Sequence, residues 1–433
     1  MMDQAQRSEI GVRNMFGLSA TGLWLCLALL LKPFYLLPSG SFQLGDICLV
    51  IAFVAYLLKK KSALYIEPCD FLLALFIICV VVINGIYFCI YQTSDFIMQT
   101  SYYMFNFITV ILFRAEMRSD VFLKRMSQVL RADLIAQLAI YCVGAGRWYL
   151  GVVGGSSRYM GTFNDPNQLA FFMFSAYAFI QIVRSKRGIR AILIDDAVTL
   201  FIVLQTASTG MLAGTLLIFI PKIVKMAVTF FSNKRFSGFA WLLMLSVCYA
   251  MAVFPFAHSE MSKGSSLFVF ERIGNKFSKL AGSNEGGTSF QDSILADRQL
   301  DKLILYPEKI LYGAGQGAYE RFERANSANE IHSSFLGMLF YYGIGPFSVL
   351  MMWIVSNFKK AKQGFYVSLI YVAFFAETLT LTNQRQPLFW ILLVLVALPT
   401  LSANDALGVK AKSGNGFKRF QNDGLAGIEC KRA

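Results

Sequence analysis

Long apolar runs alternate with short polar breaks along most of this chain, and the pattern predicts helices. A helix needs about 20 mostly apolar residues to cross a bilayer. The runs therefore predict an all-α fold, a polytopic transmembrane helical bundle of about twelve spans. The predicted spans cover residues 15–33, 44–58, 70–91, 95–113, 127–146, 168–183, 191–206, 209–229, 237–256, 332–357, 364–381 and 386–402.

Composition agrees with this class. Of 433 residues, 56% are hydrophobic and only 15% are charged, against about 25% charged residues in soluble domains. The net charge is +14, from 40 Lys and Arg against 26 Asp and Glu. Most of this basic excess falls in alternate connecting segments, as expected for cytoplasmic loops of a membrane protein. The charge therefore predicts orientation and contact with anionic lipid, and no nucleic-acid partner.

The same alternation predicts that both termini are cytoplasmic and that one large periplasmic loop separates the ninth and tenth spans. Within that loop, helical spacing of leucines over 297–311 predicts a short amphipathic helix. The predicted organisation is a cytoplasmic N-terminus (1–14), spans one to nine (15–256), the periplasmic loop (257–331), spans ten to twelve (332–402) and a basic cytoplasmic tail (403–433).

Polar residues gather at the predicted outward ends of the spans. Asp165, followed by Pro166 and Gln168, predicts a capped helix start, and Arg158 and Gly161 lie just before it. A helix N-terminus beside an arginine suits a phosphate. The alternative is that Arg158 reaches the lipid headgroups while the segment from Asn164 to Asn167 forms a tight turn.

His332 is predicted in the first turn of span ten, where the helix N-terminus disfavours imidazolium and leaves a neutral side chain that accepts a proton. An interfacial or capping histidine is the simpler alternative. Arg385 precedes span twelve, and Glu377 and Asp46 are predicted to border the same cavity.

Three segments together resemble the O-antigen ligase and O-antigen polymerase superfamily. "RYMGTFNDPNQLA" resembles its Arg, Gly, Phe, Asn-Pro-Asn pattern, and "ADRQLDKLILYPEKILYGAGQGAYERF" resembles its outward-loop pattern, with matches at Arg298, Pro307, Gly313 and Gly315. "IHSSFLGMLFYYGIGPF" resembles its His-Asn, Leu, Gly pattern, with matches at His332, Leu336, Gly343 and Gly345. The resemblance covers roughly residues 155–350.

Two positions depart from the family pattern. Ser333 follows the histidine where the family usually has Asn. Ser208, Thr209 and Gly210 open a predicted span where Ser-Arg-Gly is common.

The resemblance implies a multi-pass glycosyltransferase of the bacterial inner membrane, with its active site facing the periplasm. Its donor would be a glycan on undecaprenyl pyrophosphate and its acceptor a second glycan. We expect an inverting, metal-independent reaction with no cofactor. Arg158 and Arg298 would clamp the pyrophosphate, and His332 would deprotonate or orient the acceptor hydroxyl. Further substrate contacts are expected from Arg385, Gly161, Asn164, Asn167, Gly313, Gly315 and Glu377.

Within this family the chain is predicted to be a polysaccharide polymerase of O-antigen, capsule or exopolysaccharide. A ligase that transfers glycan to lipid A core is the alternative, because both enzymes use the same donor. A lipid-linked oligosaccharide flippase or another transporter is the alternative from a different class. Membrane lipids, a chain-length regulator and a flippase are the other expected partners. Sugar identity, linkage, chain length and oligomeric state are not encoded in these motifs.

Overall fold

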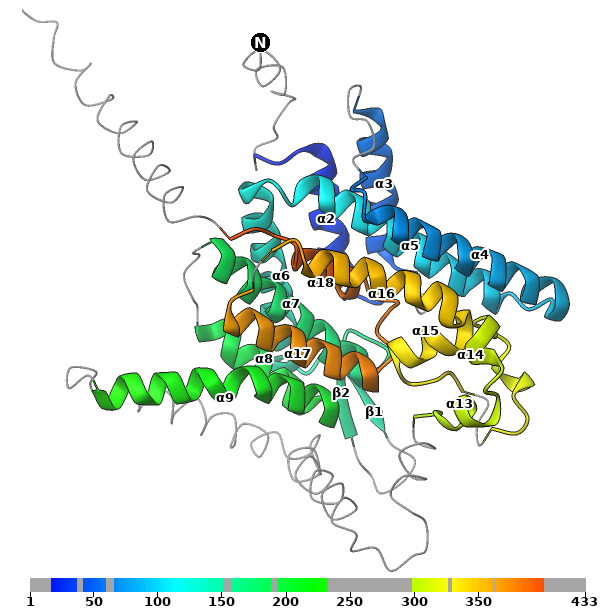
Figure 1. The fold of residues 1–433 in the computed structure, drawn as a ribbon. Coiled ribbons are helices and arrows are strands. Elements are labelled where there is room, and N and C mark those ends of the chain that lie inside the picture. The colour runs from blue at the N-terminus through cyan, green and yellow to red at the C-terminus, as the bar shows by residue number, and fades with distance from the viewer. Residues whose placement is uncertain are drawn as a thin grey trace, which may run out of the picture.

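The computed structural model describes residues 17–36, 42–59, 66–150, 157–187, 193–232, 298–325, 329–361 and 363–400. The described part is mostly helical, as expected from the apolar runs (Figure 1). The N-terminal helices are α2 (Ala20–Leu31), α3 (Leu44–Leu58), α4 (Asp70–Tyr91), α5 (Asp95–Glu116) and α6 (Asp120–Cys142). The central helices are α7 (Pro166–Arg187), α8 (Leu193–Gln205) and α9 (Thr209–Ser232). The C-terminal elements are α13 (Asp301–Leu305), α14 (Lys309–Tyr312), the 3-10 helix η1 (Tyr319–Arg321), α15 (Ser334–Tyr342), α16 (Ile344–Phe358), α17 (Phe365–Thr380) and α18 (Pro387–Leu395).

The prediction of a twelve-span transmembrane bundle is wrong. Among the described residues, only α4 and α5 are long and apolar enough to cross a bilayer, and 28% and 50% of their most apolar stretches are buried inside the protein. Five further apolar helices are shorter, at 10–17 residues. The predicted segments 1–14 and 403–433, the predicted span 237–256 and residues 257–297 of the predicted loop lie outside the described residues.

The error has a physical reason. An apolar run indicates that its side chains are removed from water. Packing inside the protein achieves this as readily as contact with lipid. The residues from Leu388 to Leu395 in α18 are all buried, as are most residues of α7, which packs against α6, α8, α9, α17 and α18. The predicted span 332–357 is also divided in two, because Gly343 adopts φ +79° between α15 and α16.

A small antiparallel ribbon, which the all-α prediction did not include, joins α6 to α7. Strand β1 (Arg147–Leu150) pairs with β2 (Ser157–Gly161), with Tyr149 opposite Arg158 and Trp148 opposite Tyr159. Tyr159 is buried and makes an edge contact with Trp148, at a ring-centroid distance of 5.1 Å. The ribbon therefore fixes the position of Arg158 before α7 begins.

The predicted amphipathic helix over 297–311 forms as two shorter helices, α13 and α14. Pro307 lies between them, and a proline restricts the residue before it and lacks an N–H for the helical hydrogen bond. Ile304 is exposed while Leu300 and Leu303 pack against the core. The amphipathic character is therefore present, but no continuous helix forms.

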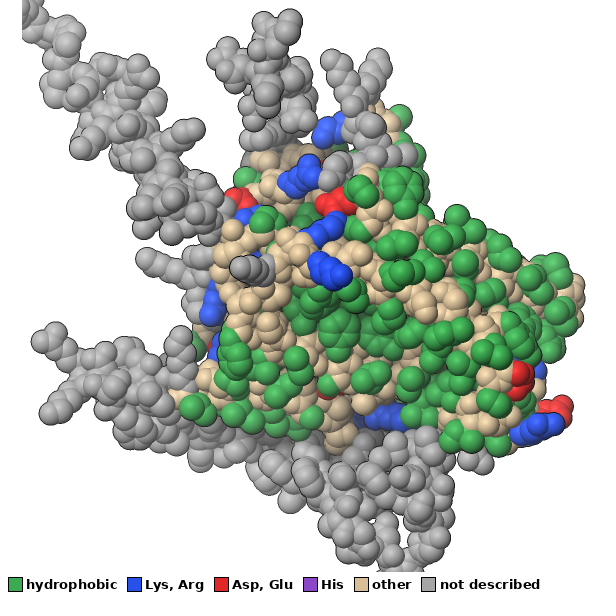
Figure 2. All heavy atoms as spheres, viewed as in Figure 1, with side chains coloured by type: hydrophobic (Ala, Val, Ile, Leu, Met, Phe, Trp, Pro, Cys, Tyr) green, Lys and Arg blue, Asp and Glu red, His purple; other side chains and the backbone are tan. Residues whose placement is uncertain are grey.

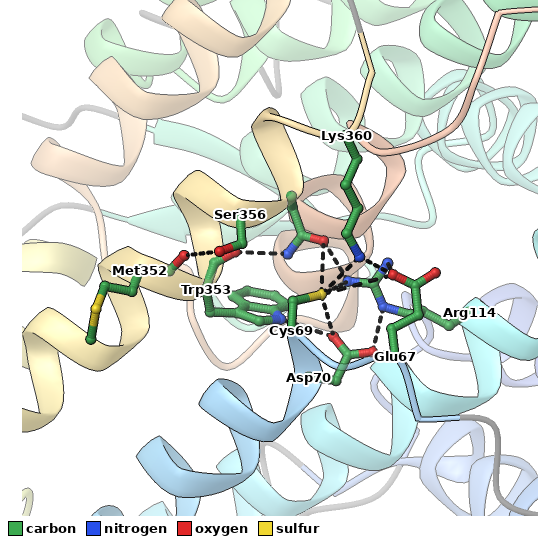
Figure 3. A network of polar contacts seen from close by, with 9 residues as sticks. Glu67, Cys69, Asp70, Arg114, Met352, Trp353, Ser356 and Lys360 are labelled. Atoms are coloured by element: carbon green, nitrogen blue, oxygen red, sulfur yellow. Dashed lines mark hydrogen bonds and ion pairs between the residues drawn. The ribbon is translucent and has the colours of Figure 1, made fainter.

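A buried ion network ties α4, α5 and α16 together at one end of the bundle (Figure 3). Arg114 Nε lies 2.6 Å from Asp70 Oδ2, and Arg114 Nη2 donates to Asn357 Oδ1 at 2.5 Å. Trp353 Nε1 donates to Asp70 Oδ1 at 2.9 Å. Because Arg114 and Asp70 are buried, this pair fixes how the three helices align.

Candidate functional site

The predicted site residues lie at the opposite end of the bundle, where α7, α9 and α18 begin and α8 and α17 end; we call this the site end. Asp165 caps α7 as predicted, since its Oδ1 accepts from the N–H groups of Asn167 at 2.7 Å and Gln168 at 3.1 Å. Pro166 is the first helical residue. The cap occupies two of the free N–H groups that were expected to bind an anion. Any phosphate at this end therefore depends on the arginines more than on the helix terminus.

Arg158 joins three elements at the site end. Its Nε donates to the carbonyl of Thr206, just after α8, at 2.9 Å, and its Nη2 donates to Asn167 Oδ1 at 2.8 Å. Ser208 Oγ also donates to Asn167 Oδ1, at 2.9 Å. These two hydrogen bonds of Arg158 are with neutral oxygens, and they orient the guanidinium. This placement differs from the alternative in which Arg158 reaches the headgroups.

Gly161 and Asn164 have structural contacts. Gly161 has φ +59°, and a Cβ there would lie 2.5 Å from Gln137 Oε1. Asn164 is exposed and accepts from Arg147 Nη1 at 2.6 Å. Gly161 therefore serves the turn between β2 and α7.

Gly313 and Gly315 also serve packing. Gly313 has φ +86°, and a Cβ there would lie 2.7 Å from the Tyr341 carbonyl oxygen. Gly315 N–H donates to the same carbonyl at 2.8 Å, and a Cβ on Gly315 would lie 2.6 Å from the Tyr87 ring. These glycines let the segment after α14 pass close to α15.

His332 lies in residues 329–334, which we call the strap. Its backbone N–H donates to the Arg298 carbonyl at 3.0 Å, and Ile331 N–H donates to Tyr341 Oη at 3.0 Å. Thr382 Oγ1 donates to the Ile331 carbonyl at 3.1 Å. Ile331 is buried while His332 is exposed. The strap is thus held by its backbone and leaves the imidazole accessible.

His332 precedes α15 instead of lying in its first turn. Ser333 is the N-cap, and its Oγ accepts from Leu336 N–H at 3.3 Å. Desolvation lowers the pKa of His332, Arg298 acts in the same direction, and Glu330 opposes them. The sequence predicted a neutral imidazole because of the helix N-terminus. The pKa is lowered, but the main cause is desolvation. Asn and Ser are both good N-caps, so the departure at Ser333 preserves the helix start.

Arg298 binds the end of α17 and acts electrostatically on Glu377, one turn before that end. Arg298 Nη1 donates to the Thr380 carbonyl at 2.5 Å. Glu377 is 3% exposed, and its Oε2 has no hydrogen-bond partner within the described part of the chain. Two glycines of α9 face Glu377: a Cβ on Gly210 would lie 3.1 Å from Oε2, and one on Gly214 would lie 2.6 Å from Oε1. Asp46, which was expected to border the same cavity as Glu377, pairs with Lys32 at 2.7 Å.

Arg385 is held by a carboxylate that the sequence reasoning missed. Its Nη2 contacts Glu330 Oε2, and its Nε donates to Gln99 Oε1 at 3.2 Å. Lys302 was also missed; its Nζ donates to the carbonyl of Asn329 in the strap. Burial lowers the pKa of Lys302 to about 8. The sequence offered one signal for this ion pair, namely that Glu330 lies two residues before His332. Its partner Arg385 lies 55 residues further along the chain, so the pairing could not be inferred.

A continuous series of contacts joins these residues. Asn167 binds Arg158 and Ser208; Gly210 lies against Glu377 and Thr380; and Thr380 binds Arg298, whose carbonyl binds the His332 N–H. Asp165, the α7 cap, also acts electrostatically on His332. The site end therefore brings two arginines and an exposed histidine into one neighbourhood. Such a group can bind an anion and accept a proton.

A cavity of about 10 Å³ lies between α2, α7 and α18, lined by Lys32, Tyr35 and Gln386 among others. It has room for one water molecule. Across the described ranges, no group of three or more His, Cys, Asp or Glu side chains is placed to hold a metal ion.

Comparison with known protein families finds no family model that matches the chain. No curated protein matches it either.

Proposed function

We propose that this chain is a glycosyltransferase that joins glycan repeat units carried on undecaprenyl pyrophosphate, that is, a polysaccharide polymerase. The observation that supports the proposal is that the Arg298 carbonyl accepts from the His332 N–H, while Arg158, held by Thr206 and Asn167, lies at the same end of the bundle. The same three residues are the ones to which the family resemblance assigns the chemistry.

Two fixed guanidinium groups suit a pyrophosphate leaving group. Arg158 is oriented by Asn167 and Thr206, and Arg298 by Thr380. Guanidinium groups offer several N–H donors in a fixed plane, which matches phosphate oxygens. Removing one preorganised donor from such a site typically lowers kcat by about 100- to 1,000-fold.

The reaction follows from these roles. The acceptor hydroxyl oxygen attacks the anomeric carbon, and a new C–O bond forms on the face opposite the pyrophosphate. The bond from the anomeric carbon to the phosphate oxygen breaks, and its electron pair remains on the pyrophosphate between the arginines. The hydroxyl proton passes to the His332 imidazole, which is neutral because its pKa is lowered. The product has inverted configuration.

A lipid-linked donor requires contact with a membrane, and the surface of α4 supports this. Eight large hydrophobic side chains of α4 are exposed: Phe71, Leu75, Ile78, Val81, Val82, Ile86, Ile90 and Tyr91. Hydrophobic side chains also cover much of the described face over α4, α16 and α17 (Figure 2). An exposed apolar area of this extent is typical of a surface that contacts lipid or another protein. We propose that it contacts the bacterial inner membrane.

The test uses membranes that contain each variant at equal abundance and the lipid-linked repeat unit of the source cell. Arg158→Gln, Arg298→Gln and His332→Gln should each shorten or abolish the glycan product, while Arg147→Gln at the same end should not. Arg147 is the matched control because it is exposed and binds Asn164 and the Tyr35 carbonyl. Wild-type chain lengths from all three test variants would sink the proposal. Transfer only to added lipid A core would identify a ligase instead.

A further inference from the structure

Glu330 is the charged side chain through which the strap meets the start of α18. Its Oε2 contacts Arg385 Nη2, and its Oε1 accepts from Gln316 Nε2 at 2.5 Å. The side chain of Glu330 is only 13% exposed. The carboxylate therefore has a partner on each oxygen.

Gln316 leaves Glu330 little freedom. Gln316 is buried, and its backbone N–H donates to Asn84 Oδ1 at 2.9 Å. Its Oε1 accepts from two hydroxyl groups, those of Tyr342 at 2.9 Å and Tyr103 at 3.2 Å. The amide N–H₂ must then face Glu330, which has to act as an acceptor. The contacts of Gln316 and Arg385 therefore hold the Glu330 carboxylate in one position.

We propose that Glu330 is a positioning residue that acts as the internal counter-anion of the site, pairing with Arg385 from a place in the strap two residues before His332. Arg385 is also fixed by Gln99 and lies 5.6 Å from the centroid of the Tyr102 ring. Because Glu330 offsets the charge of Arg385, Arg385 adds little attraction for a second anion. Arg158 and Arg298 are then the principal phosphate ligands, and Arg385 contributes only when an incoming phosphate competes with Glu330.

Among the described residues, the charged side chains with the largest effect on the His332 imidazole are Glu330, Arg298, Asp165 and Lys302. Arg298 and Lys302 disfavour its protonation, and Glu330 and Asp165 favour it. Removing the charge of Glu330 leaves one carboxylate against two cations. The pKa of His332 should therefore fall further below its ordinary value.

The effect of Glu330 on the pKa of His332 does not depend on the proposed function. The competition between Glu330 and phosphate for Arg385 rests on that function, so the experiment has two readouts. The chain has two histidines, His258 and His332. In a His258→Gln background, NMR titration of the remaining labelled imidazole reports His332 alone. Glu330→Gln is compared with Glu330→Asp and with the control Glu320→Gln, whose side chain is exposed on η1.

Glu330→Gln should lower the pKa of His332, Glu330→Asp should largely restore it, and Glu320→Gln should leave it unchanged. The second readout is calorimetric binding of inorganic pyrophosphate to the purified full chain. Glu330→Gln should tighten this binding by about tenfold at low salt, because a charge-assisted contact of Arg385 becomes available.

An unchanged His332 pKa in Glu330→Gln, or weaker pyrophosphate binding, would overturn the inference. A fall in the pKa while the wild-type protein binds no pyrophosphate would support Glu330 as counter-anion of His332 and count against the proposed function.

Discussion

Replacing Gly313 with alanine separates a glycine that binds substrate from one that holds the fold. Gly313 lies at φ +86° and ψ 158°, a region open to glycine almost alone, and forcing alanine into it costs about 1–3 kcal/mol. The new Cβ would lie 2.7 Å from the Tyr341 carbonyl oxygen and 2.8 Å from the Tyr342 carbonyl carbon. Both are backbone atoms, so relief requires α15 to move, at a further cost of about 1–3 kcal/mol. We expect a loss of about 3 kcal/mol in the free energy of unfolding.

Gly345→Ala is the matched control. Gly345 is exposed in α16, and a Cβ there would have no atom within 4 Å. Alanine in a helix is favoured over glycine by up to about 1 kcal/mol, so this variant should be as stable as the wild type or slightly more stable. Denaturant titration of the purified protein, followed by tryptophan fluorescence, measures both variants. A Gly313→Ala protein of wild-type stability with a raised donor KM would refute the packing role and restore the substrate-binding assignment.

Three other expectations follow from described contacts. Desolvation and Arg298 lower the pKa of His332, so the acidic limb of the kcat/KM profile should lie below pH 6.5. His332→Gln should remove this limb. An unchanged limb in that variant would exclude His332 as the base. Asp70→Asn should lower the free energy of unfolding by about 3–5 kcal/mol, because it leaves Arg114 buried without its closest carboxylate. Glu67 lies 3.4 Å from Arg114 and is partly exposed, so Glu67→Gln should lower it by about 1 kcal/mol or less. Equal losses in a denaturant titration would contradict the burial argument. Val82→Lys, on the exposed face of α4, should weaken liposome binding while Val82→Ala should not; unaltered binding would show that this face does not meet lipid.

Local sequence signals predicted local structure well. Asp165 and Pro166 start α7 as expected, and Gln386 and Pro387 start α18. A cap or an N-terminal proline acts within one helical turn, so its outcome can be read from neighbouring residues. The mostly helical secondary structure was also predicted correctly, from the apolar runs.

Contacts between distant segments could not be predicted in this way. Arg385 was assigned to phosphate, yet it meets Glu330, 55 residues earlier. The run in α18 was assigned to lipid, yet it is buried among other helices. A single sequence gives the apolar character of a run but not its neighbours, so the number of membrane spans was overestimated.

The most direct measurement of the central claim uses the purified full chain in nanodiscs with the lipid-linked repeat unit as the only substrate. We predict glycans longer than one repeat, released undecaprenyl pyrophosphate in equal amount to the bonds formed, and a product whose new linkage has inverted configuration. Arg158→Gln, Arg298→Gln and His332→Gln should reduce both products together. No longer glycan and no released undecaprenyl pyrophosphate from the wild-type protein would contradict the account.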